Sequence, residues 1–350
     1  MKLQRAAVTT ALLLLLAIAF ACGGGSGKAT PTGTLPTPDP ALATAKSGST
    51  GTLILAKPEG LFEFRIGSGT TKQLIAPAPA GAFLLDPALS PDAATIAYVS
   101  QPPPKVQGKQ YDAGSDLWVA ARDGSNPHAV FTHATPNQLV RFPQWEDAGH
   151  ILAIVQEFSE QSGATNVTYW LERVDVATGA RTQVLRDVLA FGLSPDHRRV
   201  VFAQLAPQTG ETLMLADLAG GTPTTLVGLD QNLAPFNFPT YSHDGTKIAF
   251  ASADQTGARA DEPAIMMASF HPAGRSLDGL PEDIWTIDAA GGTPVRVADL
   301  KEDLPALTWS GDDAHIYVFG SAALYDVNLK NGASNRIGDG GYHGQVTWTP

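Results

Sequence analysis

The chain has 350 residues, 43% of them hydrophobic and 16% charged, and its 34 acidic against 23 basic side chains give a formal net charge of −11 at pH 7. Such an acidic surface repels phosphate groups, so nucleic acid and anionic lipid headgroups are excluded as expected partners. The single cysteine excludes an intrachain disulfide, so an exported domain must be held by packing and strand pairing alone.

The first 21 residues are predicted to be an export signal. Lys2 and Arg5 make its start positive, and the apolar run 11–20 follows them. Ten apolar residues are too few to span a bilayer as a helix, and this arrangement is typical of a cleaved signal peptide.

Cys22 directly follows this segment. Ala19 and Ala21 precede it and Gly23 comes after it, which resembles the lipobox that directs a diacylglycerol onto the cysteine thiol of bacterial lipoproteins. The resemblance implies that Cys22 is lipidated and that the protein is anchored to a membrane of the cell envelope, outside the cytoplasm. Two or three acyl chains hold a protein stably, because each buried methylene contributes about 0.8 kcal/mol. Ordinary secretory cleavage after Ala21 is the alternative.

Residues 22–50 are predicted to be a tether. After Cys22 they are almost entirely Gly, Ser, Thr, Pro and Ala, which cannot bury enough apolar surface to become ordered. As a flexible coil this segment would have an end-to-end distance of roughly 30 Å. The rest of the chain, 51–350, is long enough for one large all-β domain or two small domains.

One sequence pattern recurs along residues 51–350. A short apolar stretch enters a turn that carries an aspartate, and the next apolar run begins four residues after that aspartate. A second hairpin follows, built on an Asx or glycine turn. Four short strands per repeat, at intervals of 48 to 68 residues between the aspartates, predict the blades of a β-propeller. The repeat aspartates are Asp92, Asp147, Asp196, Asp244 and Asp312.

The two ends of this region predict a sixth blade. Gln345–Pro350 reproduces the strand that enters the turn, and three apolar stretches near the start match the strands that should follow it, at 52–56, 61–66 and 72–75. A blade built from both ends closes the ring and removes the exposed sheet edge. We therefore expect an all-β fold, a six-bladed β-propeller of four-stranded antiparallel blades over residues 51–350.

These repeats resemble the WD-like repeats of the TolB family and of peptidase-associated propellers. The shared features are the Ser-Pro-Asp turn, at 90–92 and 194–196, and the Gly-Gly-Thr-Pro hairpin, at 220–223 and 291–294. The tryptophan that usually precedes the turn is kept at Trp145, Trp309 and Trp348. The resemblance implies the propeller fold. We expect neither the TolB N-terminal domain nor a hydrolase domain in this chain, so the functions of those proteins do not transfer.

The repeat aspartates and the histidines beside them are predicted to be turn residues. An aspartate in such a turn accepts backbone N–H bonds. Equivalent positions on successive blades are spread around a ring, so the histidines near them cannot converge on one zinc ion. These histidines are His150, His197, His243 and His315.

Sequence motifs of catalysis and of cofactor binding are missing. Residues 192–195 begin like the nucleophile elbow G-x-S-x-G, but Asp196 stands where the last glycine is needed. The sequence contains no H-E-x-x-H, EF-hand, glycine-rich phosphate loop or paired-cysteine motif. We therefore expect no catalytic residues, no metal and no cofactor.

Three long connections predict one functional face. They run from Gln101 to Ser115, from Glu157 to Thr168 and from Ala253 to Asp283, each between the second and third strands of a blade, so all three leave the ring on one side. The third contains Met266, Met267, Phe270 and His271, which would form either an anchor for a partner or a small satellite core. Links between blades on the same face add the candidate binding residues Arg141, Asp230, Asn232, Phe236, Phe238, Tyr342 and His343.

These features favour a binding protein over an enzyme. The leading hypothesis is a monomeric, non-catalytic scaffold or receptor that presents the long-loop face to a protein, peptide or glycan of the cell envelope. The alternative is a propeller hydrolase or lyase that acts on an envelope polymer at the central channel, with residues such as Arg141, Asp230 and His343. An acid, a base and a cation within hydrogen-bonding distance at the channel mouth would favour the enzyme.

Overall fold

The computed structural model describes residues 50–103, 113–161, 164–206, 210–256, 281–341 and 344–350. The chain divides between Asp39 and Pro40 into two units, and all described residues belong to the second. The predicted signal peptide, Cys22 and residues 23–49 of the predicted tether lie outside the described residues. Within the described ranges, no helix has the length and hydropathy of a membrane span.

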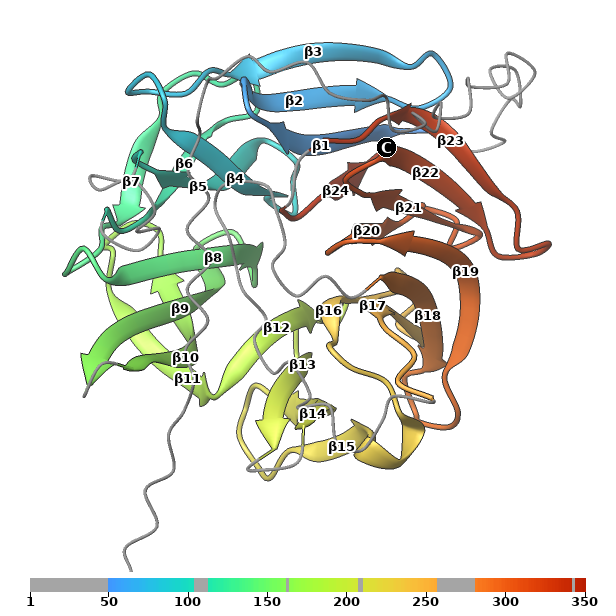
Figure 1. Cartoon of the computed structure of the whole chain (residues 1–350). Helices are drawn as coiled ribbons and strands as arrows, with labels where there is room; N and C mark the ends of the chain where they lie inside the picture. The colour runs from blue at the N-terminus through green and yellow to red at the C-terminus, as the bar shows by residue number, and fades with distance from the viewer. Residues whose placement is uncertain (1–49, 104–112, 162–163, 207–209, 257–280, 342–343) are drawn as a thin grey trace, which may run out of the picture. The chain divides into compact units, whose positions relative to one another are not determined.

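Six antiparallel sheets of four strands each are arranged around one axis (Figure 1). The predicted six-bladed β-propeller is therefore confirmed. Blades I to VI are numbered in the chain order of their second strands. The four strands of each blade are listed from the innermost to the outermost. Blades I to III are β24 (Thr347–Thr349), β1 (Thr52–Lys57), β2 (Gly60–Arg65) and β3 (Thr70–Ile75); β4 (Phe83–Leu89), β5 (Thr95–Gln101), β6 (Asp116–Ala121) and β7 (His128–Phe131); β8 (Gln138–Trp145), β9 (His150–Gln161), β10 (Ala164–Asp175) and β11 (Arg181–Arg186).

The other three blades repeat this order. They are β12 (Val188–Leu193), β13 (Arg199–Ala206), β14 (Gly210–Asp217) and β15 (Thr224–Val227); β16 (Asn237–Tyr241), β17 (Lys247–Ser252), β18 (Glu282–Asp288) and β19 (Val295–Glu302); β20 (Ala306–Trp309), β21 (His315–Phe319), β22 (Ala323–Asn328) and β23 (Ser334–Asp339). A short 3-10 turn, η2 (Leu229–Gln231), lies in the link between β15 and β16.

Blade I takes its strands from both ends of the propeller. The closing strand β24 pairs antiparallel with β1 through Thr349–Thr52, Trp348–Leu53 and Thr347–Ile54. In Figure 1 the red β24 lies against the blue β1, so the last strand is the innermost strand of the first blade.

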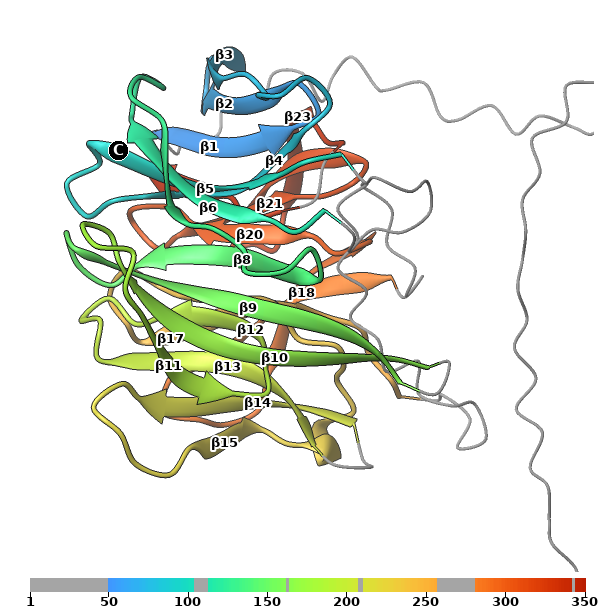
Figure 2. The same ribbon diagram turned by 90° about the vertical axis from the view of Figure 1, so that its left-hand side faces the viewer.

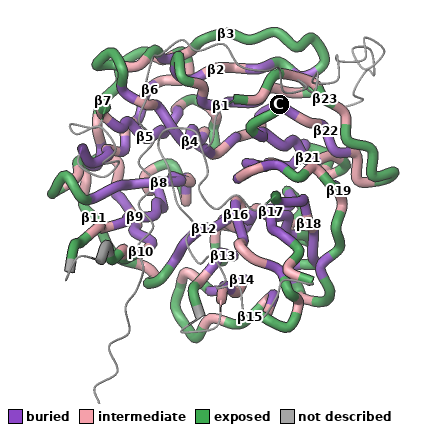
Figure 3. The backbone as a smooth tube through the Cα atoms, viewed as in Figure 1, coloured by how far each residue is buried: buried purple, intermediate pink, exposed green. Residues whose placement is uncertain are grey.

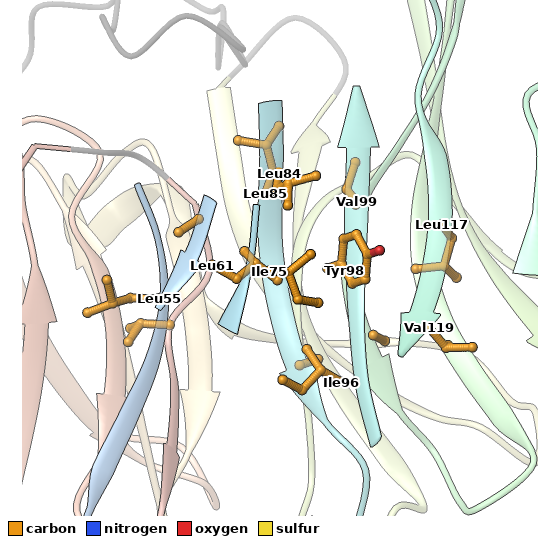
Figure 4. Packing of buried hydrophobic residues seen from close by; sticks show 14 of the residues in the cluster. Leu55, Leu61, Ile75, Leu84, Leu85, Ile96, Tyr98, Val99, Leu117 and Val119 are labelled. Atoms are coloured by element: carbon orange, nitrogen blue, oxygen red, sulfur yellow. The ribbon is translucent and has the colours of Figure 1, made fainter. Parts of the chain in front are cut away.

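The core lies between the blades, because each inner strand is covered on both faces. In β5 the six residues after Thr95 are all buried, and they read as an almost continuous apolar run instead of alternating. Figure 4 shows such packing, with Leu61 and Ile75 of blade I beside Leu85 and Ile96 of blade II. The outermost strands are far more exposed (Figure 3). Burying one such aliphatic side chain stabilises the fold by about 1.5–3 kcal/mol.

The repeat turns satisfy their own polar groups. In blade II the Ser90 hydroxyl donates to Asp92 Oδ1 over 2.6 Å, and the backbone N–H of Ala94 donates to the same oxygen over 3.0 Å. The N–H of Thr95 donates to the Ser90 hydroxyl over 2.9 Å. The same serine-to-aspartate bond recurs between Ser194 and Asp196, Ser242 and Asp244, and Ser310 and Asp312.

The tryptophans that precede the turns join neighbouring blades. Trp145 Nε1 of blade III donates to the carbonyl of Ala88 in blade II over 3.2 Å. Trp309 Nε1 of blade VI makes the equivalent bond to the carbonyl of Thr240 in blade V over 3.1 Å. A tryptophan suits this position because its ring fills the space between two sheets while its single donor reaches the neighbouring strand.

The two faces of the ring differ. The turn face carries the tight turns between the first and second strands, such as 90–94 and 194–198. The insertion face carries the connections between the second and third strands and the links between blades, including η2. Figure 2 shows the two faces on opposite sides, with the ends of β9 and β10 extending on the insertion face.

One predicted loop is a hairpin. Residues 157–168 were expected to form an irregular connection, but β9 and β10 stay paired from Asp175–His150 out to Ala164–Gln161. The prediction was wrong because polar residues can also extend a strand ladder: Val167 and Thr168 favour strand, and this segment has no proline to interrupt the pairing.

The repeat turns should make the fold sensitive to acid. The serine hydroxyl lowers the pKa of its partner carboxyl below the usual 3.8 in Asp92, Asp196, Asp244 and Asp312. Because the folded pKa is depressed, this stabilisation is present above the unfolded pKa and is lost as pH falls through the folded pKa. We expect the free energy of unfolding, measured in urea, to fall below about pH 4, and to fall less steeply when all four aspartates are changed to Asn. An unchanged pH slope in that variant would contradict this role.

Candidate functional site

The six innermost strands line a central channel. They are β24, β4, β8, β12, β16 and β20, and a cavity of about 230 Å³ lies among them. Leu89 and Trp145 at the ends of their strands, together with His243 of a repeat turn, place this cavity toward the turn face.

A buried ion pair joins two inner strands next to this cavity, on its side toward the insertion face. Asp86 of β4 is fully buried, and Arg141 of β8, 4% exposed, donates from Nε to Asp86 Oδ2 over 2.5 Å. The backbone N–H groups of Phe142 and Gln345 also donate to the Asp86 carboxylate, over 3.2 and 3.0 Å. One carboxylate thus ties together β4, β8 and the residue that leads into β24.

Each of the three inner strands β4, β8 and β16 contains a residue with positive φ that is followed by proline, and the strand is irregular at that step. Asp86, Phe142 and Phe238 each precede a proline and have φ values of 52°, 53° and 48°. The ladder register of each strand shifts at that point, because proline has no N–H to donate. The rings of Phe142 and Phe238 meet edge to face, with centroids 5.4 Å apart.

The structure corrects two of the candidate binding residues. Arg141 was predicted to lie in a link between blades, but it lies within β8 with its guanidinium held by Asp86. Phe236 was predicted to be available for binding, but it is fully buried and packs on Phe250, with ring centroids 5.4 Å apart. In both cases burial through a tertiary contact decided the outcome, Arg141 against Asp86 of blade II and Phe236 against Phe250 of blade V, and such a contact has no local sequence signal.

The remaining candidates separate into three groups. Phe238 lies in β16, not in a link, and lines the channel cavity. Asp230 and Asn232 are exposed at η2 on the insertion face, where Asn232 takes a left-handed φ of 54°. The candidates Met266, Met267, Phe270, His271, Tyr342 and His343 lie outside the described residues.

Two of the three residues named for the enzyme alternative lie on separate elements. Arg141 is buried at the channel wall, Asp230 is exposed at η2, and His343 lies outside the described residues. The repeat histidines are also separate from one another. His150 binds Asp147 and His243 binds Asp313, both over 2.9 Å, while His315 binds Asp326 over 2.6 Å.

Glu211 is a buried acid that no sequence motif singles out. It lies in β14, and its Oε1 accepts the backbone N–H of Phe236 over 3.0 Å, which holds the link between blades IV and V. Burial raises the pKa of Glu211 to about 8. Burial, together with the charge of Glu211, raises the pKa of Tyr169 to about 12. A glutamate at the start of a third strand would be read as an ordinary surface residue.

Loss of the Asp86 carboxylate should be energetically coupled to loss of the Arg141 guanidinium. Asp86→Ala leaves the Arg141 guanidinium buried without its carboxylate, and we expect the free energy of unfolding to fall by about 3–5 kcal/mol. The double variant Asp86→Ala with Arg141→Met should lose less than the sum of the two single changes. Urea unfolding of the three variants measures this coupling, and strict additivity would rule it out.

Glu211 should make stability fall with rising pH. Its folded pKa of about 8 lies above the usual 4.5, so the neutral carboxyl stabilises the fold fully below pH 4.5 and this contribution is lost as pH rises toward 8. We expect Glu211→Gln, which keeps an acceptor for the Phe236 N–H, to lose less free energy of unfolding between about pH 5 and about pH 8. Equal losses in both proteins would show that Glu211 ionises normally.

Comparison with known proteins places the chain by its fold. No family model matches the sequence, and no curated protein matches it. Among solved structures, it is similar to TolB from Acinetobacter baumannii, with TM-score 0.57, 14% identity and coverage of 88% of this chain and 68% of that one. It is also similar to a putative TolB from Agrobacterium tumefaciens, with TM-score 0.52, 14% identity and coverage of 87% and 99%.

A peptidase structure has a TM-score similar to those of the two TolB structures. The puromycin-hydrolyzing peptidase of Mycobacterium tuberculosis matches with TM-score 0.51 and 16% identity over 83% of this chain, but over only 44% of its own length. At such identities the likeness concerns the fold and not the activity. The fold of the chain is a six-bladed β-propeller, similar to the propeller of these TolB structures.

Proposed function

We propose that this protein is a membrane-anchored, extracytoplasmic binding protein that presents its insertion face to a protein, peptide or glycan of the cell envelope. The observation that carries this proposal is the difference between the two faces. The turn face is made of short turns whose polar groups bind one another. The insertion face carries the projecting β9–β10 hairpin and η2 (Figure 2).

Two exposed leucines on the insertion face support a binding role. Leu205, at the end of β13, is 40% exposed, and Leu229 of η2 is 41% exposed. The Leu229 side chain lies over Gly210, which pairs with Ala206 next to Leu205. The exposed side chains of Asp230 and Asn232 follow in the chain. Apolar side chains with a polar rim are typical of the centre of a protein-binding patch.

The place where the chain enters the propeller supports the orientation. Thr50 precedes β1, whose first residue Thr52 lies at the turn face, and the Thr50 carbonyl accepts the indole N–H of Trp348 over 3.3 Å. A tether anchored at Cys22 therefore reaches the propeller at the turn face. The insertion face is the face opposite this entry point.

The arrangement of charges supports binding over catalysis. A general acid or base must reach the proton that it transfers, directly or through one water. Asp86 is the acid of the channel wall, but both of its oxygens accept hydrogen bonds from Arg141 and from backbone N–H groups. Asp283 on the insertion side is likewise bound by Arg296 and Lys301, at 3.1 and 2.7 Å.

The leucines allow a direct test. We expect the double variant Leu205→Glu with Leu229→Glu to capture its partner roughly tenfold less or weaker still, because charges replace the apolar centre of the patch. In-cell cross-linking of the intact lipoprotein with mass spectrometry measures the loss. The matched control is Val295→Glu, since Val295 is 60% exposed on β19 near the turn face.

The outcomes separate the proposal from its competitors. Loss of a specific partner in the leucine variant and its retention in the Val295 variant supports the insertion face. Equal capture by both variants, or no captured partner with the wild-type protein, overturns the proposal. Replacement of residues 157–168 by Asn-Gly, which closes the hairpin at the Gln156–Tyr169 pair, tests the β9–β10 projection in the same assay.

A further inference from the structure

The walls of the channel cavity are polar but carry no fixed charge. Among the residues that line it there is no Asp, Glu, Lys or Arg, and His243 is its one titratable side chain. The imidazole of His243 is already bound to Asp313 over 2.9 Å at the rim. A charged ligand would lose its hydration here without gaining a partner of opposite charge. The cavity therefore suits a neutral ligand.

Three threonines form one side of the cavity. Thr240, Thr308 and Thr347 occupy the same repeat position, directly before Tyr241, Trp309 and Trp348, on the neighbouring blades V, VI and I. The Thr347 hydroxyl donates to the carbonyl of Pro87 over 2.8 Å. The Thr240 and Thr308 hydroxyls make no hydrogen bond within the described residues, and both side chains are half-buried at the cavity. Each of these two hydroxyls can therefore donate a hydrogen bond to a ligand and accept one from it.

The two glutamines that line the cavity are held rigidly. Gln144 donates to the carbonyl of Phe191 over 3.0 Å and accepts the N–H of Leu193 over 2.9 Å. Gln345 donates to the carbonyl of Pro143 over 3.0 Å. These bonds fix both amide groups before any ligand arrives, and a preformed wall lowers the entropic cost of binding.

Trp348 departs from the pattern of its repeat. Trp145 and Trp309 are 7% and 1% exposed and bind the preceding blade, but Trp348 is half-buried and donates to Thr50 instead. Its ring lies over Gly311, where a Cβ would come within 2.1 Å, and meets the His243 ring edge to face at 5.5 Å. The glycine thus leaves room for an indole that remains accessible at the turn-face end of the cavity.

We propose that this cavity binds one neutral sugar ring, at a site separate from the insertion face. Its volume of about 230 Å³ is below the roughly 300–1,000 Å³ of pockets for drug-sized ligands, which suits a single ring. Ring hydroxyls match the free hydroxyls of Thr240 and Thr308, and the apolar C–H face of the ring matches Trp348 and Phe238. The site lies on the face where the chain enters the propeller, so it binds independently of a partner on the insertion face.

Titration with free sugars tests the site. The probes are glucose and N-acetylglucosamine as neutral rings, and glucuronate as a matched ring that carries a carboxylate. We expect saturable binding of at least one neutral sugar to the full chain, seen as saturation transfer in NMR and as a change in tryptophan fluorescence, and no saturable binding of glucuronate. The fluorescence change should be lost in Trp348→Phe.

Variants of the free hydroxyls locate the sugar. Thr308→Val should weaken binding about fivefold through the loss of one hydrogen bond, and Thr308→Ser, which keeps the hydroxyl, should restore it. Thr225→Val on the exposed outer strand β15 is the control and should leave the affinity unchanged. Matching thermal unfolding of the variants shows that they fold. Absence of neutral-sugar binding, binding of glucuronate with equal affinity, or identical affinities of Thr308→Val and wild type would each overturn the proposal.

Discussion

Three residues of β24 close the ring, and the packing of every blade depends on that closure. Each inner strand has two apolar faces, so a blade without neighbours on both sides would expose half of its core to water. The chain has one cysteine and therefore no disulfide to hold its ends together. Instead, Thr347–Thr349 pairs with β1, and the side chains of Gln345 and Thr347 bind the carbonyls of Pro143 and Pro87.

The Asp86 carboxylate extends this closure across the channel. It binds the Arg141 side chain and the Phe142 N–H of β8, and the N–H of Gln345 in the segment that leads into β24, two segments far apart in the chain. A buried carboxylate with so many donors fixes one arrangement of the inner strands, because any other arrangement leaves a charge without partners.

The two ends of the channel are suited to different tasks. The insertion face projects a long hairpin and exposes two leucines, features that suit contact with a macromolecular partner. The turn-face end is a small, rigid and uncharged cavity, which is the chemistry of a small neutral ligand. The repeat itself directs attention to the second site, since Trp348 leaves the interblade bond made by Trp145 and Trp309.

Local interactions explain what could be read from the sequence. The turn bonds of Ser90 and Asp92 span five residues, and the strands around them are continuous apolar runs, so repeat number, strand order and the propeller fold were predictable before any contact was known. Ring closure followed from the same repeat, because the last segment matched the first strand of a blade. The repeat aspartates, with His197 and His243, could be placed in turns for the same reason, whereas the same prediction was wrong for His150 and His315, which are the first residues of β9 and β21.

Only the tertiary structure decided which polar residues meet. Asp86 and Arg141 are 55 residues apart, and Glu211 reaches Phe236 across 25 residues, so neither bond leaves a local pattern. Burial turned Arg141 and Phe236 from candidate binding residues into parts of the core, and left Thr240 and Thr308 side by side at a cavity. A sequence determines the elements through short-range bonds and apolar periodicity, whereas the site arises where separate blades pack against one another.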